Sequence, residues 1–426
     1  MILYRNNIVF GVFLSIVFLS LIFLINLKLD FVGFTFFINV LSCVFFLTIS
    51  LKKNISTLLF FYIFNLLFLA LIPWFHYTND SIIWALYSFS EDNYIKANFL
   101  IFFFNLFIYL FYQVSPLLFK NKLFIQDKEP NFLISLALCG VSFSIIFYAL
   151  DFNLMKVFFR GVEGDVYEEG NANPVLAIFV MLSRLLPAFI LMRYIVFKKY
   201  YKSFIIFIFV LLCDFPTGIA RFMVAFVYLP LLLCIVPSLK RSIRISLFII
   251  LGMVFIFPFL NQFRYFSFDQ KISLIPDLSF FSQGHFDAYQ NFMEVLRLDF
   301  ITYGYQLLGV FLFFIPRSFW PDKPVGSGYQ MAIDNNYAFN NISMPFIAEG
   351  YINFGYFGIL LFAGVLGFFM RQIDLKFLKD SYSGSFSYCK GVFLCAAIFF
   401  MLRGDLMSSF SFLVSGIIAF LIAEKI

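Results

Sequence analysis

Charged residues are scarce in this chain. They make up 13% of its 426 residues, whereas apolar residues make up 62% and aromatic residues 23%. A soluble globular domain carries about 25% charged residues, so the composition excludes an ordinary soluble protein and indicates a polytopic membrane protein. The formal net charge of +6 does not indicate a nucleic-acid partner, because the lysines and arginines lie in short connections between apolar runs, where membrane topology requires them.

Side chains that bind metal ions are scarce too. The chain has 2 histidines, and its 6 cysteines all lie in apolar runs. No two cysteines have the spacing of a metal site, and the polar connections hold no disulfide framework. The turn Gly326-Ser327-Gly328 is not followed by the Lys-Ser or Lys-Thr pair of a phosphate-binding loop. We therefore expect neither a metal ion nor a cofactor.

Long apolar runs dominate the chain. A helix needs about 20 apolar residues to cross a bilayer, and about twelve runs are candidates. They are residues 8–27, 31–51, 55–75, 97–119, 132–150, 174–197, 203–216, 218–236, 245–260, 346–370, 389–403 and 408–422. The pattern predicts an all-α polytopic membrane protein, and it shows no internal repeat that would favour an inverted-repeat transporter.

Basic residues set the expected orientation. Groups of lysines and arginines follow every second run, at 52–53, 120–128, 198–202, 240–244 and 371–379. Because cytoplasmic connections are enriched in these residues, we expect these turns and both termini to be cytoplasmic. The chain then divides into membrane helices over 1–260, one large outer loop over 261–345, and the last membrane helices over 346–426.

A short apolar piece, residues 306–315, lies inside this outer loop. It is too short to span comfortably, and a crossing here would move the basic group at 371–379 to the outer side, against the positive-inside rule. We therefore expect a re-entrant or interfacial helix that ends at Pro316.

Arginines on the predicted outer side form the first candidate site. They are Arg160, Arg221, Arg264, Arg317 and Arg403. A guanidinium group offers a planar fork of donors that matches phosphate, so these side chains are candidates for binding an anion. The alternative is that each pairs with a nearby acid, for example Arg221 with Asp214 and Arg403 with Asp405.

Two further residues are candidates for acid–base chemistry. His285 could act as a general base with Asp287 orienting its ring, or it could be a solvated histidine in a loop. Glu349 lies near the outer end of a long apolar run, with Asn353 one turn further on the same face. Burial would suit Glu349 to acid–base work, but a helix N-terminus would favour the same carboxylate without any chemistry.

One stretch resembles a known family. The residues Phe314-Ile315-Pro316-Arg317-Ser318-Phe319-Trp320-Pro321-Asp322-Lys323-Pro324 resemble the signature of bacterial O-antigen polymerases of the Wzy type. Asn341-Ile342-Ser343 and Glu349-Gly350-Tyr351-Ile352-Asn353-Phe354-Gly355 are similar to its continuation. Arg221 after Pro216-Thr217-Gly218, and Arg403-Gly404-Asp405, also resemble family positions.

The resemblance implies a membrane glycosyltransferase-like fold in the bacterial inner membrane, with about twelve transmembrane helices and the large loop in the periplasm. It implies polymerisation of undecaprenyl-diphosphate-linked oligosaccharide repeat units into O-antigen or capsular polysaccharide. The implied partners are this lipid-linked oligosaccharide, membrane lipid, and a chain-length regulator and flippase of the same pathway. The predicted catalytic residues are His285 and Glu349, and the predicted substrate-binding residues are Arg221, Arg317, Lys323, Arg403, Trp320 and Asn353.

Two other functions stay open at this point. An O-antigen ligase would use the same lipid-linked donor, so its arginine chemistry would look alike. A flippase for the same lipid should spread polar residues through its helices, whereas here they are concentrated in the outer loop. The sequence therefore favours the polymerase.

Overall fold

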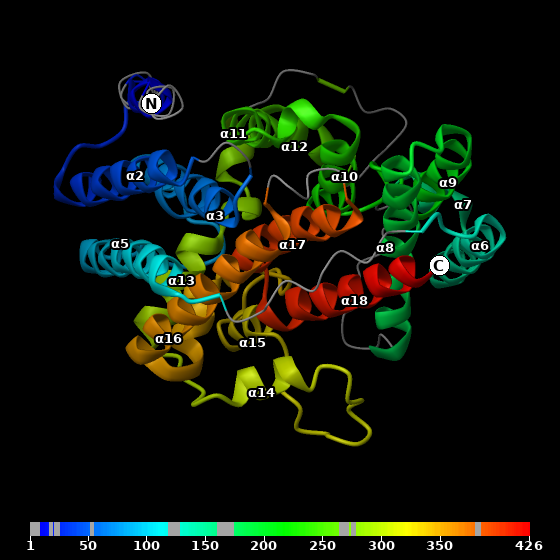
Figure 1. Cartoon of the computed structure of the whole chain (residues 1–426). Helices are drawn as coiled ribbons and strands as arrows, with labels where there is room; N and C mark the ends of the chain where they lie inside the picture. Colours follow the sequence, from blue (N-terminus) through cyan, green and yellow to red (C-terminus); the bar gives the residue numbers. More distant parts are fainter. Residues whose placement is uncertain are drawn as a thin grey trace.

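The computed structural model describes residues 9–16, 20, 26–51, 55–117, 128–159, 174–263, 272–273, 278–379 and 385–426. Within these residues the chain is helical and has no strand (Figure 1). The predicted class, an all-α polytopic membrane protein, agrees with this architecture. The candidates Arg160 and Arg264 lie outside the described residues.

In the described part of the chain, nine helical segments are long and apolar enough to cross a membrane. They are α2 (Phe31–Ser50), α3 to α4 (Thr57–Thr78), α5 (Glu91–Val114), α6 (Phe132–Ala149), α8 (Pro174–Val196), α11 to α12 (Ser242–Asn261), α16 (Phe346–Phe377), α17 (Phe386–Arg403) and α18 (Leu406–Lys425).

Two predicted crossings form helices that are too short to span the hydrocarbon core. Helices α9 (Tyr200–Cys213) and α10 (Arg221–Ile235) have 14 and 15 residues. At 1.5 Å per residue each covers roughly 20 Å, less than the ~30 Å hydrocarbon core. The count of about twelve crossings is therefore not confirmed, although the predicted runs at these positions do form helices.

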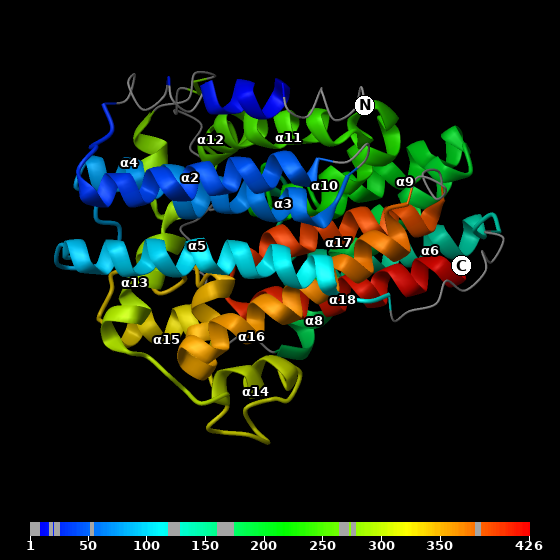
Figure 2. The same ribbon diagram turned by 60° about the vertical axis from the view of Figure 1, so that its left-hand side comes forward.

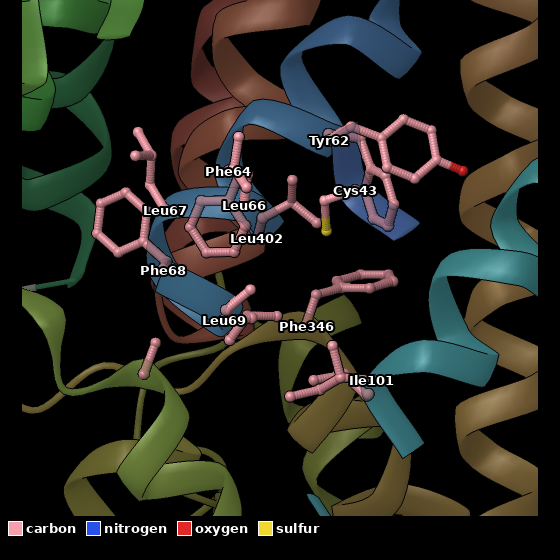
Figure 3. Packing of buried hydrophobic residues seen from close by; sticks show 14 of the residues in the cluster. Cys43, Tyr62, Phe64, Leu66, Leu67, Phe68, Leu69, Ile101, Phe346 and Leu402 are labelled. Carbon is pink, nitrogen blue, oxygen red and sulfur yellow. The ribbon is translucent and has the colours of Figure 1, made fainter. Parts of the chain in front are cut away.

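A central helical segment organises the packing. The segment Thr57–Thr78 is the most buried of the candidate spans, and its middle is the π-helix η1 (Asn65–Leu71). Figure 3 shows Phe64 and Phe68 of this segment in one hydrophobic cluster with Ile101 of α5, Phe346 of α16 and Leu402 of α17. The core thereby fixes the end of α17, where the candidate Arg403 stands.

Helix α16 departs from the predicted continuous helix. It is interrupted at Phe354 and Gly355, and Gly355 has φ +61°, a conformation that glycine adopts without steric cost. The two pieces then pack backbone to backbone, because a Cβ atom on Gly358 would lie 1.8 Å from the carbonyl oxygen of Gly350. The first piece, which carries Glu349 and Asn353, is therefore set at an angle to the rest of the helix.

The predicted outer loop is a folded layer. Its described part contains η5 (Leu278–Ser282), η6 (Gly284–Phe286), α13 (Ala288–Leu298), α14 (Tyr305–Phe311) and α15 (Ser327–Asp334). Helix α13 is buried over most of its length and contacts α5 and α16. Figure 2 shows α13, α14 and α15 together on the lower side of the bundle.

The apolar piece 306–315 forms only the seven-residue helix α14, followed by turns. A helix of this length rises about 10 Å, and Phe311 and Phe314 are more than half exposed. The two alternatives, a re-entrant helix and an interfacial helix, both stay predictions.

Candidate functional site

Arg221 and His285 meet although 64 residues separate them. Arg221 is the first residue of α10, and its Nη2 lies 2.9 Å from Nδ1 and 2.7 Å from Nε2 of His285. The guanidinium group also lies over the ring of Phe280, 5.6 Å from its centroid. A guanidinium group only donates hydrogen bonds and an amide oxygen only accepts them, so the tautomer that satisfies both neighbours accepts from Arg221 at Nδ1 and donates from Nε2 to Asn261. The Oδ1 atom of Asn261 lies 3.1 Å from Nε2 on the same ring.

Arg403 joins the same cluster from the end of α17. Its Nε donates to the carbonyl oxygen of His285 at 3.0 Å, and its Nη2 donates to that of Gly284 at 3.3 Å. The same Nη2 lies 3.5 Å from Oδ1 of Asp287. Two predicted anion-binding arginines and the predicted histidine are thus brought together by η6.

Asp287 holds this cluster in place. Its side chain is 1% exposed. Besides Arg403, it accepts hydrogen bonds from Nε1 of Trp84 at 2.8 Å and from the backbone N–H of Ser343 at 3.1 Å, and from the Ser343 hydroxyl. A buried carboxylate needs such partners to offset its lost hydration. Asp287 is predicted to orient the His285 ring, whereas in the structure its carboxylate contacts Arg403, Trp84 and Ser343.

The predicted pairing of arginines with neighbouring acids is wrong in both cases named. Asp214 pairs with Arg184, whose Nη1 lies 3.3 Å from Oδ1, rather than with Arg221. Arg403 pairs with Asp287 rather than with Asp405. The physical reason is that Asp405 turns its carboxylate toward helix N-termini, which offer unpaired N–H groups.

Glu349 and Asp405 together bind the starts of two helices. Glu349 is 1% exposed, and it accepts hydrogen bonds from the Ser327 hydroxyl and from the backbone N–H of Leu406, both at 3.0 Å. Asp405 accepts from the N–H of Gly328 at 3.0 Å and of Met407 at 2.9 Å. Helix N-termini favour negative charge.

Burial raises the pKa of Asp405, and the backbone N–H groups partly oppose this effect. Both carboxylate oxygens of Glu349 accept hydrogen bonds from the starts of α15 and α18. Glu349 therefore positions these two helices. A catalytic role for Glu349 stays a prediction.

Asn353 lies at the interruption of α16. It is fully buried, donates from Nδ2 to the carbonyl oxygen of Glu349 at 2.9 Å, and accepts at Oδ1 from the N–H of Leu307 at 2.8 Å. These contacts attach α14 to α16. Its predicted contact with substrate is not tested by them.

The stretch 314–324 closes on itself. The Arg317 guanidinium group donates to the carbonyl oxygens of Lys323 at 2.6 Å and Pro324 at 3.3 Å. The Lys323 ammonium group donates to the carbonyl oxygens of Phe313 at 2.5 Å and Ile315 at 3.0 Å. Burial, and then the charge of Arg317, lower the pKa of Lys323.

Trp320, in the same stretch, packs edge-on against Tyr305, with ring centroids 6.1 Å apart. These contacts hold the loop together, and they do not join it to the Arg221–Arg403 cluster. The predicted substrate-binding roles of Arg317, Lys323 and Trp320 stay predictions.

An apolar cavity of about 340 Å³ leads up to the cluster. Its walls come mainly from α10, from the α11 to α12 segment and from α17, and they include Phe222, Phe257 and Phe400. Among the described lining residues Arg403 is the only charged one. Two other lining residues, Phe222 and Leu260, are the chain neighbours of Arg221 and Asn261, so the cavity wall adjoins the cluster.

Sequence reasoning missed Trp84, Asn261 and the cavity. Trp84 lies in a polar connection and Asn261 directly follows an apolar run, which are weak signals without the fold.

No group of three or more histidine, cysteine, aspartate or glutamate side chains able to hold a metal ion occurs among the described residues.

The fold defines a multi-pass helical membrane protein in which a polar cluster closes one end of an apolar cavity. Residues 326–423 match the family model described as O-antigen polysaccharide polymerase Wzy. The match confirms the resemblance to Wzy-type polymerases over α15 to α18, and it contains Glu349, Asn353, Arg403 and Asp405. The stretch 314–324 lies just before it. No curated protein and no solved structure matches the chain.

Proposed function

We propose that the chain polymerises lipid-diphosphate-linked oligosaccharide units on the outer face of the bacterial inner membrane, with both of its termini in the cytoplasm. The family match supports an O-antigen polymerase role in general. One observation supports the donor: Arg221 and Arg403, from two different helices, both contact His285, and Arg403 is the charged residue among the described lining of an apolar cavity. That arrangement suits an amphiphile with an anionic head and a hydrocarbon tail.

The head group would bind at the arginines. The Arg221 guanidinium group contacts the His285 ring, and the Arg403 guanidinium group contacts backbone carbonyl oxygens and, at 3.5 Å, the Asp287 carboxylate. A diphosphate offers shorter, charge-assisted hydrogen bonds to the same groups. The tail, an undecaprenyl chain, would occupy the cavity between α10 and α17, whose lining is apolar apart from Arg403.

The reaction is a glycosyl transfer. The acceptor hydroxyl oxygen forms a bond to the anomeric carbon of the donor sugar, and the bond from that carbon to the diphosphate oxygen breaks. The diphosphate leaves with the electron pair, and the arginines stabilise its growing negative charge. The hydroxyl proton goes to a base.

His285 is the preferred base. Its ring nitrogen accepts a hydrogen bond from Arg221, so the ring becomes able to take a proton when Arg221 turns to the diphosphate. A general base must be unprotonated and within hydrogen-bond distance of the proton that it takes. Glu349 is less suitable because both of its carboxylate oxygens already accept hydrogen bonds.

The test uses a deletion strain complemented with variants and a lipopolysaccharide gel. We expect wild type and Arg244→Ala to restore a ladder, since Arg244 is an exposed arginine that donates to the carbonyl oxygen of Ser238 and lies outside the site. Arg221→Ala and Arg403→Ala should leave core with one repeat unit at normal membrane abundance. A ladder in both site variants would refute the proposed site. Bare core in the deletion strain would favour a ligase instead.

A further inference from the structure

Two connections far apart in sequence come together over α13. The connection between α4 and α5 carries Trp84 and Tyr87, and the connection between α15 and α16 carries Tyr337 and Phe339. The rings of Trp84 and Phe339 stack with centroids 5.3 Å apart and planes 24° apart. We call Trp84, Tyr87, Tyr337 and Phe339 the aromatic shelf.

The shelf is anchored to α13 by ionic groups. Glu294 accepts two hydrogen bonds from Arg297, at 3.1 and 2.9 Å, and one from the Tyr87 hydroxyl. The Arg297 guanidinium group lies 4.5 Å from the centroid of the Tyr87 ring. Burial, and then the Glu294 carboxylate, raise the pKa of Tyr337. Anchoring of this kind fixes ring positions before any ligand arrives, which lowers the entropic cost of binding.

The rings stay accessible despite this anchoring. Tyr87 is 37% exposed, and the other three rings of the shelf are half-buried. The position of Trp84 also requires Gly284, because a Cβ atom there would lie 2.2 Å from the indole ring. The shelf is therefore a preformed surface of aromatic rings with polar edges.

The shelf is continuous with the arginine cluster. Trp84 and Arg403 contact the same carboxylate, that of Asp287. Glu294 lies seven residues along the chain from Asp287, which corresponds to ~10 Å along a helix. A ligand on the shelf would thus lie beside the head group of a donor bound at Arg221 and Arg403.

We propose that the aromatic shelf binds the pyranose rings of the acceptor oligosaccharide. The inference rests on the proposed function. Pyranose rings have apolar faces that pack on aromatic rings, and hydroxyl groups that bond to polar ring edges such as the Tyr87 and Tyr337 hydroxyls. The charges that contact the shelf pair within the protein, Glu294 with Arg297 and Asp287 with Arg403, which suits an uncharged ligand better than a phosphate.

The test measures glycan binding to the full chain, purified in detergent. The probe is the lipid-free glycan released by mild acid from the polysaccharide of the same strain, and the readout is saturation-transfer NMR with titration. We expect Tyr87→Ala and Phe339→Ala to weaken binding about tenfold or more, as loss of stacking contacts predicts. The matched control is Tyr303→Ala, which removes an aromatic ring that is 86% exposed and outside the shelf.

The outcomes separate this inference from the proposed function. A short polyprenyl diphosphate should still bind Tyr87→Ala and Phe339→Ala as it binds wild type, while their ladders on a gel become shorter. Glycan binding that is absent in wild type, or equal in wild type and both shelf variants, would overturn the shelf and leave the arginine site standing. An equal loss of glycan binding in Tyr303→Ala would show that the weaker binding of the shelf variants comes from nonspecific aromatic contacts, and it would overturn the shelf.

Discussion

The substitution Asp287→Ala probes the cluster most severely. It would remove the carboxylate that Arg403, Trp84 and Ser343 share. Breaking a buried ion pair from one side costs about 3–5 kcal/mol, and each buried donor left unpaired costs about 1–3 kcal/mol. The Arg403 side chain is 27% exposed, so water can solvate it after the substitution and lower the cost. We therefore expect the free energy of unfolding to fall by about 3–5 kcal/mol in all.

The assay is thermal unfolding in detergent together with the lipopolysaccharide ladder. We expect Asp287→Ala to melt several degrees lower and to lose the ladder. Asp287→Asn, which keeps an acceptor oxygen, should lie between Asp287→Ala and wild type. The matched control is Asp80→Ala, since Asp80 is 84% exposed and pairs with Lys28 at 3.1 Å, and a surface pair of this kind contributes about 0–1 kcal/mol. A wild-type melting temperature and ladder in Asp287→Ala would refute the reasoning.

Three further substitutions test other parts of the structure. Gly358→Ala should destabilise the chain by about 2 kcal/mol or more, because its Cβ would meet Gly350; an unchanged melting temperature would contradict the close approach. Burial raises the pKa of Asp214 from 3.8 to about 7. The folded state therefore binds the carboxyl proton more tightly than the unfolded state, and the stability that this proton contributes is lost as pH rises toward 7. Melting temperature should therefore fall between about pH 4 and pH 7 in wild type and less so in Asp214→Asn; equal slopes in the two proteins would contradict this prediction. Glu349→Gln should reduce membrane abundance and ladder together, whereas ladder loss at full abundance would restore Glu349 as a base.

The sequence predicted the helices better than their interruptions. Apolar runs gave the position of α2, α5, α6 and α18, because a span needs only length and apolar content. The interruption of α16 at Gly355 was not predicted. A glycine inside an apolar run is common in membrane helices, and only the approach of Gly350 to Gly358 explains this one.

The candidate site was predicted residue by residue, but its assembly was not. Arg221, His285 and Arg403 were each candidates, yet 64 and 118 residues separate the contacting pairs. The alternative pairing took acids close in sequence as the arginine partners. In the structure Arg403 pairs with Asp287, and Asp214 pairs with Arg184. Contacts of this kind depend on which helices pack together, and apolar composition does not specify that.

The most direct test of the arginine site is equilibrium binding of a short polyprenyl diphosphate to the purified chain. Loss of one charge-assisted hydrogen-bond partner costs about 1.5–3 kcal/mol, or roughly 10- to 100-fold in affinity. We expect Arg221→Ala and Arg403→Ala each to weaken binding by this factor, Arg244→Ala to leave it unchanged, and the corresponding polyprenol to bind weakly to all. Equal affinity of wild type and both site variants for the diphosphate would contradict the account.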